Sequence, residues 1–189
     1  MTAEPFAATS SNASPAHPAH PDRLGPLVRA DGRWTIGDPE GKAHLVLTPE
    51  GLEHHVTGKE SHPVPWGRLM ELNVAVTVDS FFSSPLGGLF SKTAGITTNG
   101  SCLRAMVRHP YDMWSPHFTH HHEFYSAREI TLLQSLLVIV VHRGRADLLG
   151  DDAWLTTAVR RLAAHRPRSR WRSGDDGMAL VESLVAQAP

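Results

Sequence analysis

The 189-residue sequence contains a single cysteine, Cys102, so it can form no disulfide within one chain. For the same reason, one chain offers neither a cysteine-based zinc site nor an iron–sulfur centre. It also lacks an excess of basic charge, because the formal net charge is -1 and only 3 of its 18 basic residues are lysines. This balance disfavours a globally cationic nucleic-acid binder, although it permits a local basic patch. We expect a protein of the reducing cytoplasm that carries no cofactor.

Long apolar runs are also absent. The most apolar stretch, residues 132–141, includes Gln134 and Ser135, and it falls short of the roughly 18 to 20 apolar residues that span a bilayer. The first 23 residues are rich in Ala, Pro and Ser and lack the basic start and apolar core of a secretory signal. We therefore predict no transmembrane segment, and a disordered tail over residues 1–23.

What the sequence does contain is strand periodicity with turn residues between the strands. Apolar side chains alternate in Ala43–Leu47 and in Leu52–Val56, and residues 48–51, TPEG, supply a turn between them. A second hairpin is predicted around the Asp31-Gly32 dipeptide. Three further strands are predicted from edge and alternation signals: Ser61–Val64, Leu72–Val78 and, as the last strand of the sheet, Ser101–Arg108.

The order of motifs over residues 45–78 resembles a known family. It reads LxLTPEGL, a short strand, PVPWGRL and a long aliphatic strand. This order is similar to the first half of bacterial pleckstrin-homology-like (PH-like) domains, in which a Trp-containing turn leads into a meander strand. The resemblance implies an antiparallel PH-like β-roll or barrel closed by a C-terminal helix. Such folds bind proteins, peptides or lipids, so the fold alone does not choose a ligand.

Three helices are predicted after the strands. The sequence SARE forms a capping box between Ser126 and Glu129, and apolar residues at spacings of three and four carry the helix to about Gly144. A second helix runs from an Asp151 N-cap to about residue 165, and a third over about 177–186. We expect the first helix to be covered from two sides, because three additional apolar residues leave it little polar face: Leu132, Val138 and Ile139.

These elements predict an α+β protein with three parts. A disordered Ala/Pro/Ser-rich tail occupies residues 1–23, and the PH-like β-roll with its closing helix occupies 24–145. Residues 146–189 form a helical extension packed on the same unit, which the PH-like pattern does not explain. This length suits one domain with an appendage.

The segment 81–90, FFSSPLGGLF, concentrates large apolar side chains among turn formers. A phosphate-binding loop is rejected here, because Ser91 stands where a glycine must precede Lys92. The apolar side chains either join the core or form an exposed loop, and the sequence leaves both open. We predict a noncatalytic binding or scaffold module that engages a protein partner or a second copy through this loop if it is exposed; lipid or membrane-surface binding by the PH-like roll is an alternative. The contact residues of the loop would be Phe81, Phe82, Leu86, Leu89 and Phe90.

A histidine-rich connection, residues 109–125, supports a rival hypothesis. We expect this connection to pack on the domain as a lid. Imidazole is a common metal ligand, so a small metal protein or enzyme could use His117, His120 and His122. Adjacent residues of an extended chain point to alternate sides, however, which weakens this metal site. No catalytic motif occurs at diagnostic spacing, which disfavours an enzyme.

A basic cluster around Trp171 could bind anions. One short cluster on a near-neutral chain neutralises only a few phosphates, so we expect no strong nucleic-acid binding. A solvated loop explains the same residues. The members of the cluster are Arg166, Arg168, Arg170 and Arg172.

Overall fold

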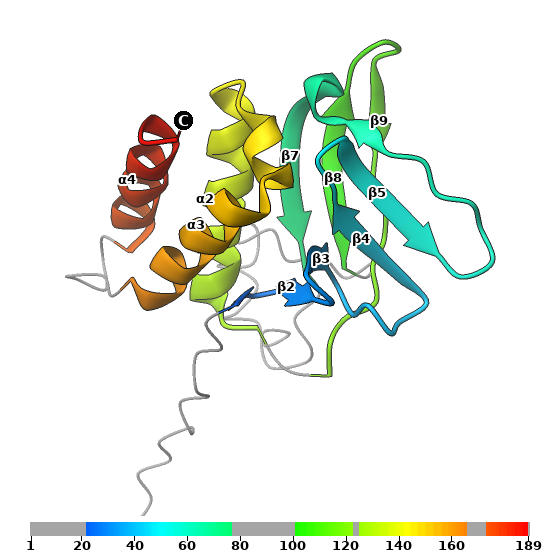
Figure 1. Cartoon of the computed structure of the whole chain (residues 1–189), viewed down its shortest axis with the longest axis horizontal. Helices are drawn as coiled ribbons and strands as arrows, with labels where there is room; N and C mark the ends of the chain where they lie inside the picture. Colours follow the sequence, from blue (N-terminus) through cyan, green and yellow to red (C-terminus); the bar gives the residue numbers. More distant parts are fainter. Residues whose placement is uncertain (1–21, 77–100, 123–124, 166–172, 189) are drawn as a thin grey trace, which may run out of the picture.

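The computed structural model describes residues 22–76, 101–122, 125–165 and 173–188 (Figure 1). Within these residues the chain is α+β, with two antiparallel sheets whose strands follow the order of the sequence. One sheet comprises β1 (Arg23–Leu24), β2 (Leu27–Ala30), β3 (Arg33–Ile36), β4 (Ala43–Leu47), β5 (Gly51–Val56) and β6 (Val64–Pro65). The other comprises β7 (Leu69–Ala75), β8 (Cys102–Val107) and β9 (Asp112–Trp114). The helices are α2 (Ala127–His142), α3 (Asp152–Ala164) and α4 (Ser173–Ala186).

Both predicted hairpins are confirmed. Asp31 and Gly32, between β2 and β3, have φ values of 50° and 77°, as a two-residue hairpin turn with positive φ at both central positions requires. Between β4 and β5, the Thr48 amide and hydroxyl both donate to the Gly51 carbonyl, at 2.9 Å each. The buried Trp66 indole donates to the Thr48 carbonyl at 2.9 Å, so this turn is tied to the start of the second sheet.

Several predicted strand limits are wrong. The expected strand over Ser61–Val64 is reduced to β6, which pairs only with Gly51 and Leu52. The long strand begins earlier than Leu72, at Leu69, and ends at Ala75, while residues 77–78 lie outside the described part. The strand over 101–108 is β8, whose alternating residues Leu103, Ala105 and Val107 are buried, but it is not the last strand.

The connection from 109 to 125 is not simply a lid. Residues 112–114 form β9 on the edge of β8. Further along, the amide of Phe118 donates to the Ser101 carbonyl at 3.1 Å, and that of Thr119 to the Ala43 carbonyl at 2.7 Å. Periodicity missed β9 because a strand of three residues, two of them exposed, shows no alternation.

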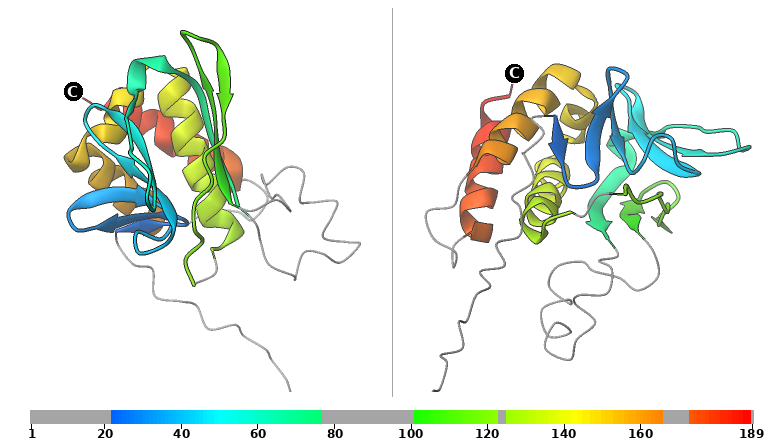
Figure 2. Two further views of the ribbon diagram at one scale, coloured as in Figure 1. Left: turned by 90° about the vertical axis from the view of Figure 1, so that its right-hand side faces the viewer. Right: turned by 90° about the horizontal axis from the view of Figure 1, so that it is seen from below.

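The two sheets do not close into a barrel, which corrects the barrel form of the prediction (Figure 2). β6 is too short to continue the ladder, and the 3₁₀ helix η1 (Trp66–Arg68) turns the chain into the second sheet. On the other side, Thr119 receives a hydrogen bond from the amide of Asp38 at 2.9 Å and donates to β4. The sheets are therefore joined there by a single segment rather than by a strand ladder.

The capping box that begins α2 is confirmed. The Ser126 hydroxyl accepts from the Glu129 amide at 3.2 Å, and the Glu129 carboxylate accepts from the Ser126 amide at 2.9 Å. Gly144, with φ of 70°, follows the helix end. α2 packs on β7 and on α4, but Val138 is 45% exposed, so the expected cover from two sides leaves one face open.

The two later helices pack on the same hydrophobic core as the strands. Asp151 caps α3 by accepting from the Trp154 amide at 3.0 Å, as predicted. α4 begins at Ser173, earlier than the expected Gly177. Leu155 of α3 and Val181 of α4 are fully buried in the core cluster that also contains Leu24 of β1. Between α2 and α3, the 3₁₀ helix η2 (Ala146–Gly150) contacts the first sheet and η1.

Candidate functional site

Two sets of predicted contact residues lie outside the described residues. These are the apolar segment, with Phe81, Phe82, Leu86, Leu89 and Phe90, and the basic cluster, with Arg166, Arg168, Arg170 and Arg172. Their proposed roles stay predictions. The three candidate metal ligands, His117, His120 and His122, are described.

His117 and His120 have different contacts. The carbonyl of His117 lies 2.9 Å from Nε2 of His54. The His120 ring packs on the Tyr125 ring with centroids 4.2 Å apart, and its Nδ1 lies 2.6 Å from the carbonyl of His121. Across the described residues, no group of three or more His, Cys, Asp or Glu side chains is placed to hold a metal ion. The metal hypothesis therefore gains no support from this geometry.

A different histidine pair is brought together by β4 and β5. His44 and His55 are cross-strand partners whose rings stack with centroids 5.2 Å apart and planes 5° from parallel. His55 also bonds the Glu53 carboxylate at 2.8 Å. Burial, followed by the neighbouring His55, lowers the pKa of His44 below its ordinary value of 6.5, and Asp38 opposes the shift.

This lowered pKa predicts that stability falls with pH below about 6.5. The His44 ring takes up its proton at a higher pH in the unfolded chain than in the folded chain. The contribution of neutral His44 to folding stability is therefore complete above pH 6.5, and it is lost as the pH falls through the lowered pKa of the folded state. His44→Gln should flatten this decline in urea midpoints measured from about pH 7.5 to about pH 5. His62→Gln, at a side chain that is 78% exposed, should keep the wild-type slope. An unchanged slope in His44→Gln would show that another group controls the decline.

Exposed methionine side chains gather on the outer face of the second sheet. Met106 of β8 pairs directly with Met113 of β9, and Glu71 of β7 lies opposite Met106 on the other side. A bulge between Leu69 and Glu71 makes Met70 an extra residue of β7. Met70 and Met113 are 46% and 59% exposed, so long thioether side chains cover this face.

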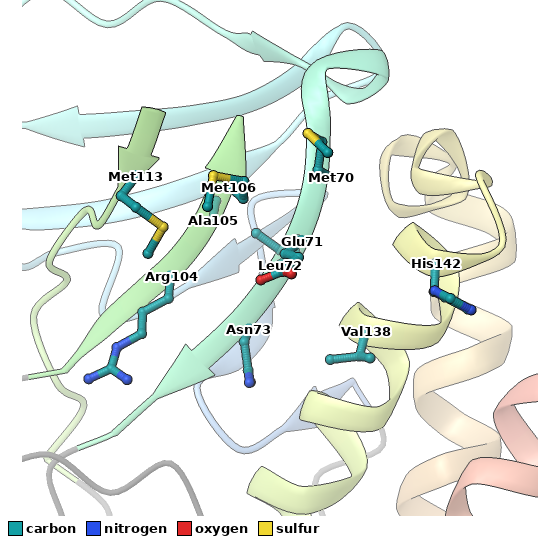
Figure 3. A pocket seen from close by; sticks show the side chains of 10 residues that line it. All are labelled: Met70, Glu71, Leu72, Asn73, Arg104, Ala105, Met106, Met113, Val138 and His142. Carbon is teal, nitrogen blue, oxygen red and sulfur yellow. The ribbon is translucent and has the colours of Figure 1, made fainter. Parts of the chain in front are cut away.

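Helix α2, beside β7, contributes Val138 and His142 to a groove that the methionines also line (Figure 3). Val138 and His142 are four residues apart and therefore lie on one side of α2. The groove, which we call the methionine groove, has a volume of about 380 Å³. Its lining comprises Met70, Glu71, Leu72, Asn73, Arg104, Ala105, Met106, Met113, Val138 and His142.

A second groove, of about 360 Å³, lies where the β2–β3 and β4–β5 turns meet the start of α3. Two of its lining residues, Trp34 and Asp152, already have partners within the fold. The Arg29 guanidinium pairs with the Asp152 carboxylate at 2.7 Å, and the Trp34 indole donates to the Thr156 hydroxyl at 3.3 Å. Trp34 and Asp152 of this groove are thus engaged in contacts within the fold, and we take the methionine groove as the candidate for binding.

Sequence analysis found only part of the methionine groove. The alternation over 101–108 places Arg104 and Met106 on the outer face of β8, as the structure has them. Met113 was missed with β9, and Met70 faces outward because of a bulge that periodicity does not reveal. Three of the five methionines in the chain gather on this one face, a signal that emerges only once the strands are paired.

Comparison with protein-family models, with curated proteins and with solved structures finds no match for this chain. The PH-like resemblance therefore stays a prediction. Among the described helices, none has the length and hydrophobicity needed to cross a bilayer.

Proposed function

We propose that this protein is a noncatalytic binding or scaffold module of the PH-like kind, which holds a protein partner in the methionine groove. The order of its elements supports the fold assignment. Four antiparallel strands, β2 to β5, precede the short β6 and the three-stranded sheet β7 to β9, and the capped helix α2 follows directly. The helices α3 and α4 are then an addition to this plan.

One observation carries the functional proposal: the methionine groove exposes apolar side chains that the fold itself does not cover. Met70, Met113 and Val138 are each at least 45% exposed and line the same groove. A folded chain normally keeps exposed apolar surface of this kind small unless it serves an interface. Methionine suits this role because its flexible, polarizable side chain fits partners of varied shape.

The polar residues of the groove suit recognition. Glu71, Arg104 and His142 stand among the apolar side chains, and polar groups of this kind fix the orientation of a bound chain. In the sequence, segment 81–90 connects β7 to β8, the strands that form much of the groove. Its contribution as a second contact remains a prediction from sequence.

The proposal predicts that the double variant Met106→Ser with Met113→Ser loses partner capture. Tagged wild-type and variant chains would be recovered from the native host under equal expression, and co-purifying proteins quantified by mass spectrometry. Removing two thioether contacts should reduce specific partner recovery at least about tenfold, as for central residues of an interface.

Met178→Ser is the matched control, because Met178 is 47% exposed on α4 and lies outside the groove. It should leave recovery unchanged. Met106 is partly buried, so the single variant Met113→Ser is used as well if the double variant melts lower. Equal recovery of the same proteins by wild type and Met113→Ser, with no effect of the double variant, would refute the proposed function.

A further inference from the structure

The edge of β7 that is not paired with β8 has its backbone groups at Val74 hydrogen-bonded to side chains of the protein itself. Nε2 of Gln134, on α2, donates to the Val74 carbonyl at 3.0 Å, and Oδ1 of Asn73 accepts from the Val74 amide at 2.8 Å. Leu103, the partner of Val74 in β8, donates its amide to Pro116 on the far side, so the backbone groups of Val74 face away from β8. A partner strand added to β7 would need these same two groups. Strand addition is therefore blocked there.

The floor of the methionine groove is made of side chains rather than free backbone groups. An extended segment laid over Met70, Met106 and Met113 would leave many of its own amides and carbonyls without hydrogen-bond partners, which is costly away from water. A helix satisfies these groups internally and presents only side chains. The groove chemistry thus favours a helical partner over an extended one.

The two charged residues that the sheet contributes to the groove lining, Glu71 and Arg104, define which helix would fit. Glu71 and Arg104 make no ion pair with any other residue in the described part of the chain. Because Glu71 pairs with Met106 and Arg104 with Asn73, Glu71 and Arg104 are diagonal neighbours on adjacent strands, about 7 to 8 Å apart. Helix residues three or four apart are separated by about 5 to 6 Å. The long side chains of Glu71 and Arg104 can span this difference, so an acidic and a basic residue at that helical spacing can meet both charges.

We propose that the methionine groove binds an amphipathic helix of a protein partner. Its apolar face lies on Met70, Met106 and Met113, an acidic residue pairs with Arg104, and a basic residue three or four positions away pairs with Glu71. This inference rests on the proposed function and adds the conformation and the charge pattern of the bound segment. Arg104 offers the planar, bidentate geometry that carboxylates favour.

Two phage-displayed peptide libraries of equal length test the proposal. One randomises a single face of a helical scaffold, and the other randomises the same positions around a central proline, which breaks the helix. Both are selected on the full chain, with the Met106→Ser and Met113→Ser double variant for counter-selection. Binders should come from the helical library and should carry an acidic and a basic residue three or four apart. Their affinity should fall at least about tenfold on the double variant.

Charge reversal supplies the specific control. Arg104→Glu should weaken the selected peptides about tenfold, and replacing the acidic residue of the peptide with Lys should restore binding to this variant alone. Met178→Ser should bind every selected peptide as wild type does. If Arg104 only supported the fold, the Lys-containing peptide would not bind the Arg104→Glu variant better than the original peptide does. If that peptide fails to restore binding, the assigned charge pattern is wrong.

The remaining outcomes separate this inference from the proposed function. Methionine-dependent binders that come only from the proline library would overturn the helical partner and leave a protein-binding groove. Concentration-dependent dimerisation that the double variant abolishes would assign the groove to a second copy of the chain and would also overturn the inference. If neither library yields a binder that depends on Met106 and Met113, the inference and the proposed function both fail.

Discussion

Replacing Leu136 with Asp is expected to abolish cooperative folding of the whole chain. Leu136 is fully buried at the middle of α2, the helix that packs on both β7 and α4. An aspartate there would place a carboxylate among aliphatic side chains, where nothing in the described core could pair with its charge. The loss should exceed about 4 to 5 kcal/mol, which is comparable to the total stability of many domains, about 5 to 15 kcal/mol.

Val138→Asp is the matched control for this substitution. It introduces the same charge on the same helix only two residues away, but Val138 is 45% exposed beside the methionine groove. Its carboxylate can stay hydrated, so the melting temperature should change by only a few degrees. Circular dichroism melts and amide NMR spectra of both variants would show whether each variant folds and at what temperature it unfolds. A folded Leu136→Asp protein with a wild-type melting temperature would mean that α2 is not the centre of the core.

The features that the sequence predicted correctly are those whose signal is complete within a few residues. The Asp31-Gly32 turn needs only positive φ at two positions, and the caps at Ser126 and Asp151 each need one side chain and an amide three residues on. The period of two in β8 is equally local. Such signals survive in any tertiary context that keeps the element, which is why they hold here.

The features that the sequence missed depend on contacts between distant segments. Whether the sheets close into a barrel is decided by two-residue β6 and by the hydrogen bonds of Thr119 to Asp38 and Ala43, none of which has a sequence signature. The candidate site has the same dependence. Val138 was expected to be covered because it is apolar, yet its exposure follows from where β7 and α4 meet α2. The sequence pattern predicts which face of a helix or strand is apolar, but it does not predict which other element packs on that face.

The contact between η2 and the β4–β5 turn is a further case, because it requires a glycine that no local pattern explains. A Cβ added at Gly150 would lie 2.4 Å from the Thr48 carbonyl oxygen and 2.8 Å from the Trp66 indole nitrogen. These two atoms are hydrogen-bonded to each other at 2.9 Å. The absence of a side chain at Gly150 therefore lets η2, which leads into α3, approach the turn of the first sheet and the start of the second.

Gly150→Ala is accordingly expected to destabilise the protein by about 2 to 4 kcal/mol, from overpacking against backbone and from strain on a buried hydrogen bond. The methyl group cannot be accommodated by rotation of a flexible side chain, since one of the atoms it meets is the Thr48 main-chain oxygen. The indole would lose its acceptor if Thr48 moved away. Urea unfolding followed by tryptophan fluorescence would measure both the loss of stability and the changed surroundings of Trp66.

Gly67→Ala provides the control from the same region of the chain. A Cβ at Gly67 meets no heavy atom within 4 Å, and its carbonyl, which accepts from the Arg108 guanidinium, is kept by alanine. Its effect should stay within about 0.5 kcal/mol. If Gly150→Ala were equally neutral, η2 would not be packed against the Thr48–Trp66 hydrogen bond.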